Sequence, residues 1–275
     1  MDSDVARTTV LITGADAGIG REFVPFFAGT GHNLVLVGRE KPVLEGIAAA
    51  ARKVFRVNAC VIGCDLAEPD GARTVFAELL QRKIDIGILV NDAGVGSHGE
   101  FAAVELQAVE RIMQVNIVAL TALTKLVLPG MIARGGGKIL NVASTAAFVP
   151  LPMNGVYGAA KAYVLSFSQA LAEELKGTGV TVTALCPGPT ESGFVGKAGF
   201  EEAPPCGKHA MSALSVARMG FRALMRGGSL AVPGWRNLAM ISLIRLMPRL
   251  LVAKVAKQTM MKRLELHVNP NANGA

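Results

Sequence analysis

The chain of 275 residues is poor in cysteine, aromatic residues and charge. Its four cysteines are too few for a disulfide-stabilised secreted scaffold, and neither a Cys-x-x-Cys pair nor a neighbouring histidine gives them metal-ligand spacing. We therefore interpret Cys60, Cys64, Cys186 and Cys206 as reduced thiols and expect no metal site. Because 51% of the residues are hydrophobic and only 18% are charged, the composition excludes a disordered chain and predicts one large core.

The sequence also lacks the pattern of a signal peptide. Residues 1–4 are acidic and lead directly into a strand-like run, so we expect no leader and a reducing, cytoplasmic setting. The longest stretch without a charged residue, Ile139 to Ala160, contains Pro150 and Pro152 together with polar side chains. These residues would break a helix exposed to lipid, and a buried strand followed by a loop is predicted there instead.

Acidic residues are missing from one long region near the C-terminus. The net charge is +7, and the region from Ser229 to Leu264 contains seven basic residues and no acid, which leaves 21 basic and 21 acidic residues elsewhere. The basic residues are Arg236, Arg245, Arg249, Lys254, Lys257, Lys262 and Arg263. No nucleic-acid recognition motif accompanies them, so we expect no nucleic-acid partner.

Short apolar runs rich in β-branched residues alternate with longer segments of helical periodicity. Seven runs are predicted to be strands: Thr8 to Ile12, Asn33 to Val37, Val57 to Ile62, Ile86 to Val90, Lys138 to Val142, Val180 to Leu185 and Ser229 to Val232. This alternation predicts an α/β fold, a doubly wound seven-stranded parallel sheet with helices on both faces. We expect residues 1–234 to form this unit and residues 235–275 to form a helical extension packed on it.

The segment from about Pro189 to Ala210 has no clear periodicity. Long loops at the carboxyl ends of parallel strands border the ligand crevice, so this segment is predicted to be a flexible lid over the substrate. The alternative is an ordinary surface loop.

A glycine-rich turn follows the first predicted strand, in the sequence Thr13-Gly14-Ala15-Asp16-Ala17-Gly18-Ile19-Gly20. Gly14 allows a sharp turn, Gly18 allows the backbone to approach a pyrophosphate, and Gly20 allows close packing of the next helix. The start of that helix offers N–H groups and the positive end of a dipole. The segment is therefore predicted to bind the phosphates of a dinucleotide.

Tyr157 and Lys161 lie four residues apart in a segment of helical periodicity, so their side chains share one helix face. A nearby ammonium favours a phenolate, and we expect Lys161 to lower the pKa of Tyr157 from its ordinary value near 10. The pair is predicted to exchange a proton with a substrate oxygen. Tyr163, the other tyrosine, has Phe167 four residues on and forms no such pair.

Together these motifs resemble the short-chain dehydrogenase/reductase family, from Thr8 to about Thr190. The resemblance rests on the glycine turn and on six further motifs in the expected order: Asp65 after the third strand, Asn91-Asp92-Ala93-Gly94 after the fourth, Asn116 in a helix, Ser144 after the fifth, Tyr157 to Lys161, and Pro187-Gly188-Pro189-Thr190 after the sixth. Asp92 departs from the family pattern, which usually has a second asparagine there. The resemblance implies a Rossmann-type fold and an oxidoreductase.

The resemblance also implies the roles of the site residues. Ser144 would orient and polarise the substrate carbonyl, Tyr157 would donate the proton, Lys161 would assist Tyr157 and hold the ribose hydroxyls, and Asn116 would hold a water of the proton relay. For Asn116 the alternative is a hydrogen bond within the core. The residues expected to contact the cofactor are Gly14, Asp16, Ala17, Gly18, Ile19, Gly20, Arg39, Asp65, Leu66, Asn91, Ala93, Gly94, Tyr157, Lys161, Pro187, Gly188 and Thr190.

Asp65 would meet the adenine amino group, although a lone Asp after a strand also caps the next helix. The choice between NAD and NADP depends on the end of the second strand, where an acid would bind the ribose 2′-hydroxyl and repel a 2′-phosphate. That position is Gly38, and Arg39 follows it. Because a guanidinium suits a phosphate, we predict NADP(H) rather than NAD(H); a solvated loop charge is the alternative.

The activity expected from this site is hydride transfer between NADP(H) and a carbonyl or secondary alcohol. An NAD-dependent alcohol dehydrogenase and a non-catalytic dinucleotide sensor are the alternatives. Apolar residues near the expected crevice suggest a hydrophobic or bulky substrate, namely Phe148, Val149, Leu151, Met153, Phe194 and Val195.

The C-terminal region has apolar segments with interspersed cations, from Trp235 to Met247 and from Arg249 to Leu264, and Pro248 is expected to break the helix between them. This extension is predicted to pack over the crevice or a partner subunit, with contact to an anionic membrane as the less favoured alternative. The resemblance further implies a homodimer or homotetramer, with the helix from about Glu105 to Ala133 as a candidate contact.

Overall fold

The computed structural model describes residues 8–191, 210–244 and 246–268. Its centre is a parallel sheet in the order β3-β2-β1-β4-β5-β6-β9. The strands are β1 (Thr9–Thr13), β2 (Asn33–Gly38), β3 (Ala59–Gly63), β4 (Ile86–Asn91), β5 (Gly137–Val142), β6 (Val180–Leu185) and β9 (Leu230–Ala231). All seven predicted strands are confirmed, and the doubly wound α/β fold with them.

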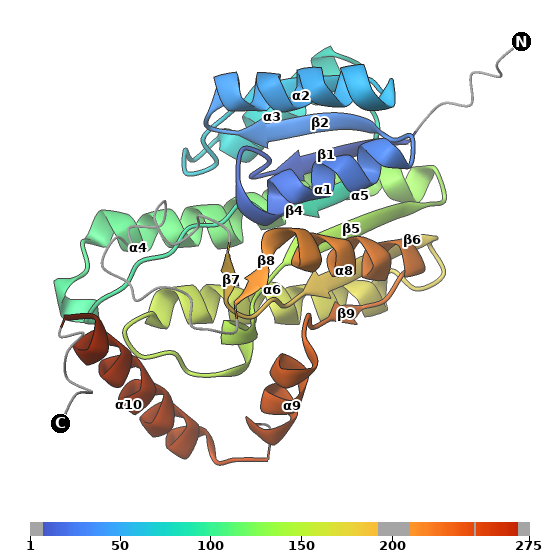
Figure 1. Cartoon of the computed structure of the whole chain (residues 1–275). Coiled ribbons are helices and arrows are strands. Elements are labelled where there is room, and N and C mark those ends of the chain that lie inside the picture. The colour runs from blue at the N-terminus through green and yellow to red at the C-terminus, as the bar shows by residue number, and fades with distance from the viewer. Residues whose placement is uncertain (1–7, 192–209, 245, 269–275) are drawn as a thin grey trace, which may run out of the picture.

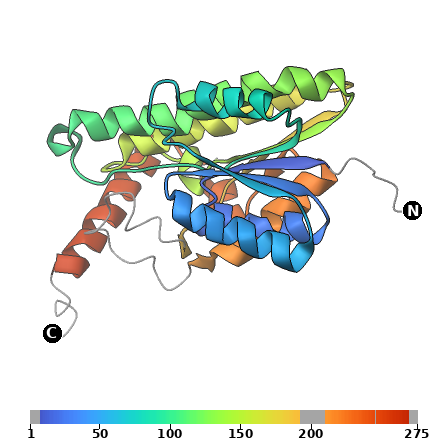
Figure 2. The same ribbon diagram turned by 90° about the horizontal axis from the view of Figure 1, so that it is seen from above.

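Helices cover both faces of this sheet (Figures 1 and 2). The helices are α1 (Gly18–Gly29), α2 (Lys41–Phe55), α3 (Gly71–Gln81), α4 (Leu106–Met113), α5 (Leu120–Ala133), α6 (Gly155–Glu174), α8 (Ala213–Arg226), α9 (Trp235–Ile244) and α10 (Arg249–Val268). Helices α1, α2 and α8 pack on one face, and α3, α5 and α6 pack on the other. The order of the strands reverses between β1 and β4, which is where ligands bind in such folds.

Each strand contributes to two hydrophobic layers because successive side chains point to opposite faces. In β1, Val10 and Ile12 pack with Phe23 and Phe27 of α1, whereas Leu11 packs in the layer under α5. All five of these side chains are fully buried. A strand that is buried on both faces has no polar alternation, which explains why these runs are continuously apolar in the sequence.

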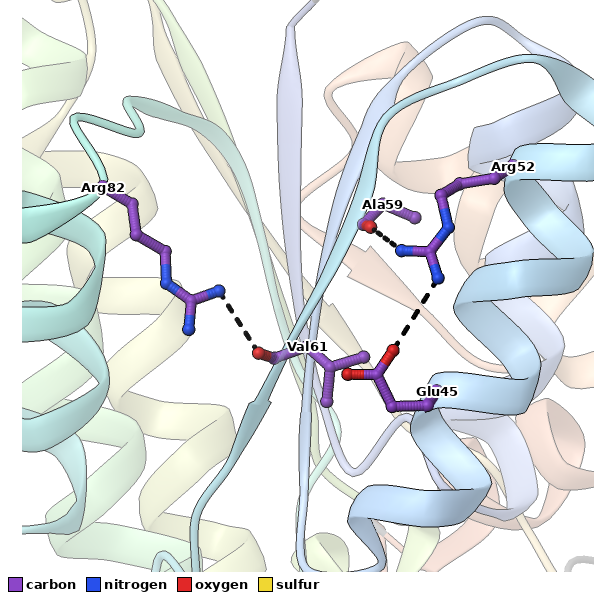
Figure 3. Close-up of polar contacts among 5 residues, drawn as sticks. All are labelled: Glu45, Arg52, Ala59, Val61 and Arg82. Carbon is purple, nitrogen blue, oxygen red and sulfur yellow. Dashed lines mark hydrogen bonds and ion pairs between the residues drawn. The ribbon is translucent and has the colours of Figure 1, made fainter.

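Strand β3 forms one edge of the sheet, and arginines from neighbouring elements bind its outward carbonyl groups (Figure 3). Arg52 of α2 donates a hydrogen bond to the main-chain oxygen of Ala59 at 2.6 Å, and Glu45 lies 3.7 Å from the same guanidinium. Arg82, after α3, donates to the oxygen of Val61 at 3.3 Å. Two free acceptors of the edge strand are thereby satisfied, which hinders pairing with a strand of another chain.

The long helix expected from Glu105 to Ala133 is present but not regular. It begins with α4 at Leu106, passes through a π-helical segment from Gln114 to Ala119, named η2, and continues as α5. In the described part of the chain it is the one helix long and apolar enough to cross a membrane, but core helices of soluble proteins pass the same test. A π segment in an α-helix often marks a functional site, and η2 contains Asn116.

The C-terminal region forms two helices, α9 and α10, and Pro248 lies between them as predicted. Helix α9 packs against the short 3₁₀ helix η3 (Thr145–Phe148), which follows β5. The proposed lid falls largely outside the described residues, since residues 192–209, including Phe194, Val195 and Cys206, are not among them. The ends of this segment pair in parallel as β7 (Thr190–Glu191) and β8 (Met211–Ser212).

Candidate active site

The glycine-rich turn between β1 and α1 has the backbone conformation that a phosphate site needs. Gly14 and Gly18 have φ angles of 68° and 55°, which residues with a side chain rarely adopt. A Cβ atom on Gly14 would lie 3.0 Å from the backbone of Ala93, so the turn is in contact with the loop after β4. Ala17, the N-cap of α1, offers no side-chain acceptor, and the start of the helix is thus suited to an anionic ligand. These features fit the pyrophosphate of a dinucleotide.

Thr13, the last residue of β1, holds the loop after β4 in position. Its hydroxyl oxygen accepts hydrogen bonds from the main-chain N–H groups of Asp92 and Ala93, both at 3.1 Å. The hydroxyl also lies 3.4 Å from the oxygen of Val90, to which it donates. In the sequence Thr13 is recognisable only as part of the turn, and this role could not be predicted because the two segments are far apart in the chain.

Asn91 belongs to a buried polar network behind this loop. Its side-chain amide donates to Thr124 at 3.1 Å and to Asn141 at 2.9 Å, and Asn141 donates to Ser168 at 2.9 Å. The network joins β4 to β5, α5 and α6. The side chain of Asn91 thus points into the protein, and a contact of Asn91 with the cofactor stays a prediction.

Asn116 binds the loop after β4 from the π-helical segment η2. Its side-chain oxygen accepts the N–H of Val95 at 2.9 Å, and its amide donates to the oxygen of Val95 at 2.8 Å. The side chain is 1% exposed. This is the hydrogen bond within the core that the sequence left open as the alternative, and a contact with a relay water stays a prediction.

Ser144, Tyr157 and Lys161 come together beyond the carboxyl end of β5. Ser144 caps η3 by accepting the N–H of Ala146 at 3.1 Å, and it also forms a side-chain hydrogen bond with Tyr157. Tyr157 and Lys161 lie on α6, one turn apart as predicted. The Nζ atom of Lys161 is 5.8 Å from the centre of the Tyr157 ring and donates a hydrogen bond to the oxygen of Val142 at 2.8 Å.

The expected lowering of the Tyr157 pKa is wrong for this structure. Burial raises the pKa of Tyr157 to about 12, the hydrogen bond with Ser144 acts against this shift, and the negative charge of Asp92 adds to it. Burial lowers the pKa of Lys161 to about 8, although Asp92 favours its charged form. Lys161 is thus attracted by the charge of Asp92 and donates its hydrogen bond to the main-chain oxygen of Val142. A protonated phenol is the form that donates a proton, so the shift suits Tyr157 as an acid.

Asp92 is a third ionisable group in the site, and the sequence assigned no role to it. Its carboxylate accepts a hydrogen bond from the main-chain N–H of Gly20, in the first turn of α1. Burial raises the pKa of Asp92 to about 7, the charge of Lys161 and the Gly20 hydrogen bond act in the opposite direction, and the like charge of Asp16 adds to the rise. Asp92 therefore titrates near neutral pH between the glycine turn and the Tyr157–Lys161 pair.

The adenosine end of the expected dinucleotide site carries charges of both signs. A Cβ atom on Gly38 would lie 3.0 Å from the Cγ and Oδ1 atoms of Asp16. Gly38 ends β2, so the glycine turn brings a carboxylate to the strand end where the sequence itself has no acid. Arg39, which follows Gly38, is exposed. A carboxylate and a guanidinium therefore both lie at the end of β2, where the sequence had pointed to Arg39 alone.

Asp65 is fixed by two partners. Its carboxylate accepts the N–H of Ala67 at 2.9 Å and forms an ion pair with Arg111 of α4 at 2.8 Å. Burial alone would raise the pKa of Asp65, but these hydrogen bonds and the charges of Arg111 and Arg39 lower it. Asp70, not Asp65, is the N-cap of α3, so the helix-cap alternative is wrong. The neighbouring Leu66 is 6% exposed and packs in the core.

The segment after β6 lies against the first C-terminal helix. A Cβ atom on Gly188 would be 2.6 Å from the side-chain amide of Asn237 in α9, so a side chain at this position would displace Asn237. Asn237 donates to the oxygen of Pro233 at 2.7 Å, and Thr190 donates to the oxygen of Gly188 at 2.9 Å. The start of the C-terminal extension is thus packed beside a segment expected to contact the cofactor.

Comparison with known proteins agrees with this geometry. A sequence model of a family described as short chain dehydrogenase matches residues 8–202. The very-long-chain 3-oxoacyl-CoA reductase of Homo sapiens is 32% identical over 181 residues, which make up 64% of this chain and 57% of that protein. The chain thus spans less than two thirds of the length of this relative.

Two solved structures resemble the chain over most of its length. A short-chain dehydrogenase from Sphingobium yanoikuyae in complex with NADPH has a TM-score of 0.79 and 32% identity, covering 93% of this chain and 95% of that one. A bulky-bulky ketone specific alcohol dehydrogenase from Comamonas testosteroni has a TM-score of 0.73 and 31% identity, covering 88% and 95%. The likeness therefore includes part of the C-terminal extension.

Proposed function

The chain belongs to the short-chain dehydrogenase family of NAD(P)-binding oxidoreductases, and on that premise we propose that it reduces a hydrophobic ketone or aldehyde with NADPH. The observation that carries the proposal is the cluster of Ser144, Tyr157 and Lys161 at the end of β5. A phenol with a raised pKa is protonated at neutral pH and can act as the general acid.

Each residue of this cluster would have its own role in the reduction of the carbonyl. NADPH, when bound, supplies the hydride. The hydroxyl of Ser144 donates a hydrogen bond to the substrate carbonyl and orients it toward Tyr157, whose phenol gives its proton to the oxygen that becomes the alcohol. The charge of Lys161 stabilises the phenolate that remains. Both polar atoms of the Asn116 side chain are hydrogen-bonded to the main chain of Val95. If Asn116 takes part in a proton relay, it would therefore do so through its main-chain groups.

The residues around the glycine turn would hold the dinucleotide. Gly14, Gly18 and the start of α1 would bind the pyrophosphate. At the adenosine end, Arg39 would bind a 2′-phosphate as a charge-assisted pair, and this supports NADPH. Asp16 favours the second candidate, an NAD-dependent alcohol dehydrogenase, because a carboxylate at the end of β2 would accept the ribose 2′-hydroxyl.

The proposed substrate is a bulky or long apolar ketone. An apolar segment between β5 and α6 is partly exposed, and it is formed by Phe148, Val149, Leu151 and Met153. The names of two similar proteins, one acting on very-long-chain 3-oxoacyl-CoA and one specific for bulky-bulky ketones, point in the same direction. Helix α9, packed against η3, would form a further wall of the substrate site.

We also propose that the chain forms a homodimer or homotetramer through the helices α5 and α6. Their outer faces expose apolar side chains, including Ile132 and Tyr163. Light scattering of the purified protein measures the mass directly. A monomer at micromolar concentration would contradict this assembly.

The substrate proposal is tested by following NADPH absorbance with a panel of carbonyl compounds. The panel contains short aldehydes, aryl ketones with two bulky substituents and 3-oxoacyl thioesters of increasing chain length, and each is repeated with NADH. We expect kcat/KM to rise with apolar size. Turnover limited to small polar carbonyls would contradict the proposed substrate class, and turnover with NADH alone would establish the second candidate.

A further inference from the structure

Asp92 lies between the glycine-rich turn and the Tyr157–Lys161 pair. Its main chain is held by Thr13 of β1, and its carboxylate accepts the N–H of Gly20 in α1. A Cβ atom on Gly20 would lie 2.7 Å from the Oδ2 atom of Asp92, so only glycine leaves room for this contact. The side chain is recessed but not fully buried. Asp92 therefore touches the turn expected to bind phosphate while it acts on the catalytic pair.

The charged groups around Asp92 come from two elements. From α6, Lys161 attracts the carboxylate, and Tyr157 is itself affected by its charge. From the glycine turn, Asp16 repels it. These opposing influences, together with burial, leave the pKa of Asp92 at about 7 and that of Lys161 at about 8. A further charge brought to this cluster would change the protonation of Asp92.

A bound dinucleotide brings such a charge. Its pyrophosphate is anionic and would lie at the start of α1, where Gly20 also donates to Asp92. An anion near a carboxylate disfavours the ionised form and raises the pKa. We propose that Asp92 is a positioning residue that takes up a proton from solvent when the dinucleotide binds, which releases the charge of Lys161 to act on Tyr157.

The consequence is a coupling between cofactor binding and proton transfer. While Asp92 is ionised, it balances the ammonium of Lys161 and raises the pKa of Tyr157. Once Asp92 is neutral, both effects end, and Lys161 stabilises the phenolate without competition. The only covalent change is the O–H bond formed on the Asp92 carboxylate. The inference rests on the proposed dinucleotide site. It adds that binding at this site is coupled to the protonation of Asp92.

The experiment is an infrared difference spectrum, NADPH-bound minus free, recorded near pH 7 for the wild-type protein and for Asp92→Asn. Asparagine has the same shape and can still accept the Gly20 N–H, so the variant is expected to fold and to bind NADPH. The wild type should gain the C=O band of a protonated carboxylic acid, which shifts in D₂O, and Asp92→Asn should not. The exposed Asp70→Asn is the matched control and should keep the band.

Calorimetry of NADPH binding in two buffers of different ionisation enthalpy gives the number of protons taken up. With a pKa of about 7, Asp92 should account for up to about half a proton per site at pH 7. If NADPH binds and neither protein gains the carboxylic acid band, or both gain it equally, the inference fails and the proposed function stands. If NADPH does not bind to the wild type at all, the proposed function fails and the inference with it.

Discussion

The ammonium of Lys161 donates a hydrogen bond to the main-chain oxygen of Val142 at 2.8 Å while it lies 5.8 Å from the centre of the Tyr157 ring. Val142 is the last residue of β5, so the end of a central strand fixes the cation beside the phenol. The helix α6 supplies both side chains from one face. The position of the pair thus depends on the rigid sheet and not on a loop.

Replacing Lys161 with methionine should lower kcat/KM by about 100-fold or more, because the phenolate loses its stabilising charge. Steady-state kinetics with NADPH and the best ketone of the panel measure the change. Lys138→Met, which removes an exposed hydrogen bond to the oxygen of Met225, is the matched control and should have little effect. Equal losses in the two variants would contradict the role of Lys161.

Replacing Thr13 with valine should destabilise the protein by about 1–3 kcal/mol, because the N–H groups of Asp92 and Ala93 lose their acceptor. Thr13→Ser keeps the hydroxyl and should retain most of this stability. Urea unfolding of the three proteins measures the difference. If serine costs as much as valine, the loss is due to packing and not to the hydroxyl.

The two charges at the adenosine end should change cofactor preference in opposite directions. Asp16→Ser removes the carboxylate beside Gly38 and should strengthen NADPH binding relative to NADH, whereas Arg39→Ala should weaken it, each by about 10-fold or more. Dissociation constants from cofactor fluorescence give the ratio. An unchanged ratio in Arg39→Ala would remove the basis for predicting NADP(H).

The stability of the free protein should depend on Asp92 in a defined pH window. Since the pKa of Asp92 is raised from 3.8 to about 7, the folded state binds its proton more tightly than the unfolded state, and stability falls as pH rises from about 4 to 7. Asp92→Asn should therefore be more stable than the wild type at pH 8, by roughly 1–2 kcal/mol given the partial exposure of the side chain. The advantage should disappear near pH 4. Melting temperatures across this range measure it, and a constant difference would exclude titration as the cause.

The sheet could be predicted from the sequence because its strands are apolar on both faces and end in recognisable turns. The spacing of Tyr157 and Lys161 likewise predicted their shared helix face. The π-helical segment around Asn116 could not be predicted, since its residues have ordinary helical periodicity. The β7–β8 pairing depends on residues 21 positions apart and left no local signal.

The charges and pKa values at the site were harder to predict from the sequence than the identity of the residues that form it. The sequence showed no acid at the end of β2, but the glycine turn folds Asp16 onto Gly38. The sequence also suggested that Lys161 lowers the pKa of Tyr157, whereas burial and the charge of Asp92 raise it against the opposing hydrogen bond with Ser144. Both errors have the same origin. The burial of a group and its distances to several charges are known only from the three-dimensional structure.

The most direct test of the proposed activity compares Tyr157→Phe with Tyr163→Phe. Both lie on α6, but Tyr163 stacks on Phe167 and bonds to Thr121 at the surface. Without the phenolic proton, Tyr157→Phe should lose at least about 100-fold in NADPH-dependent ketone reduction while NADPH binding is retained, and Tyr163→Phe should stay near the wild type. Full activity in Tyr157→Phe, or tight NADPH binding by the wild type without turnover of any carbonyl compound, would contradict the account.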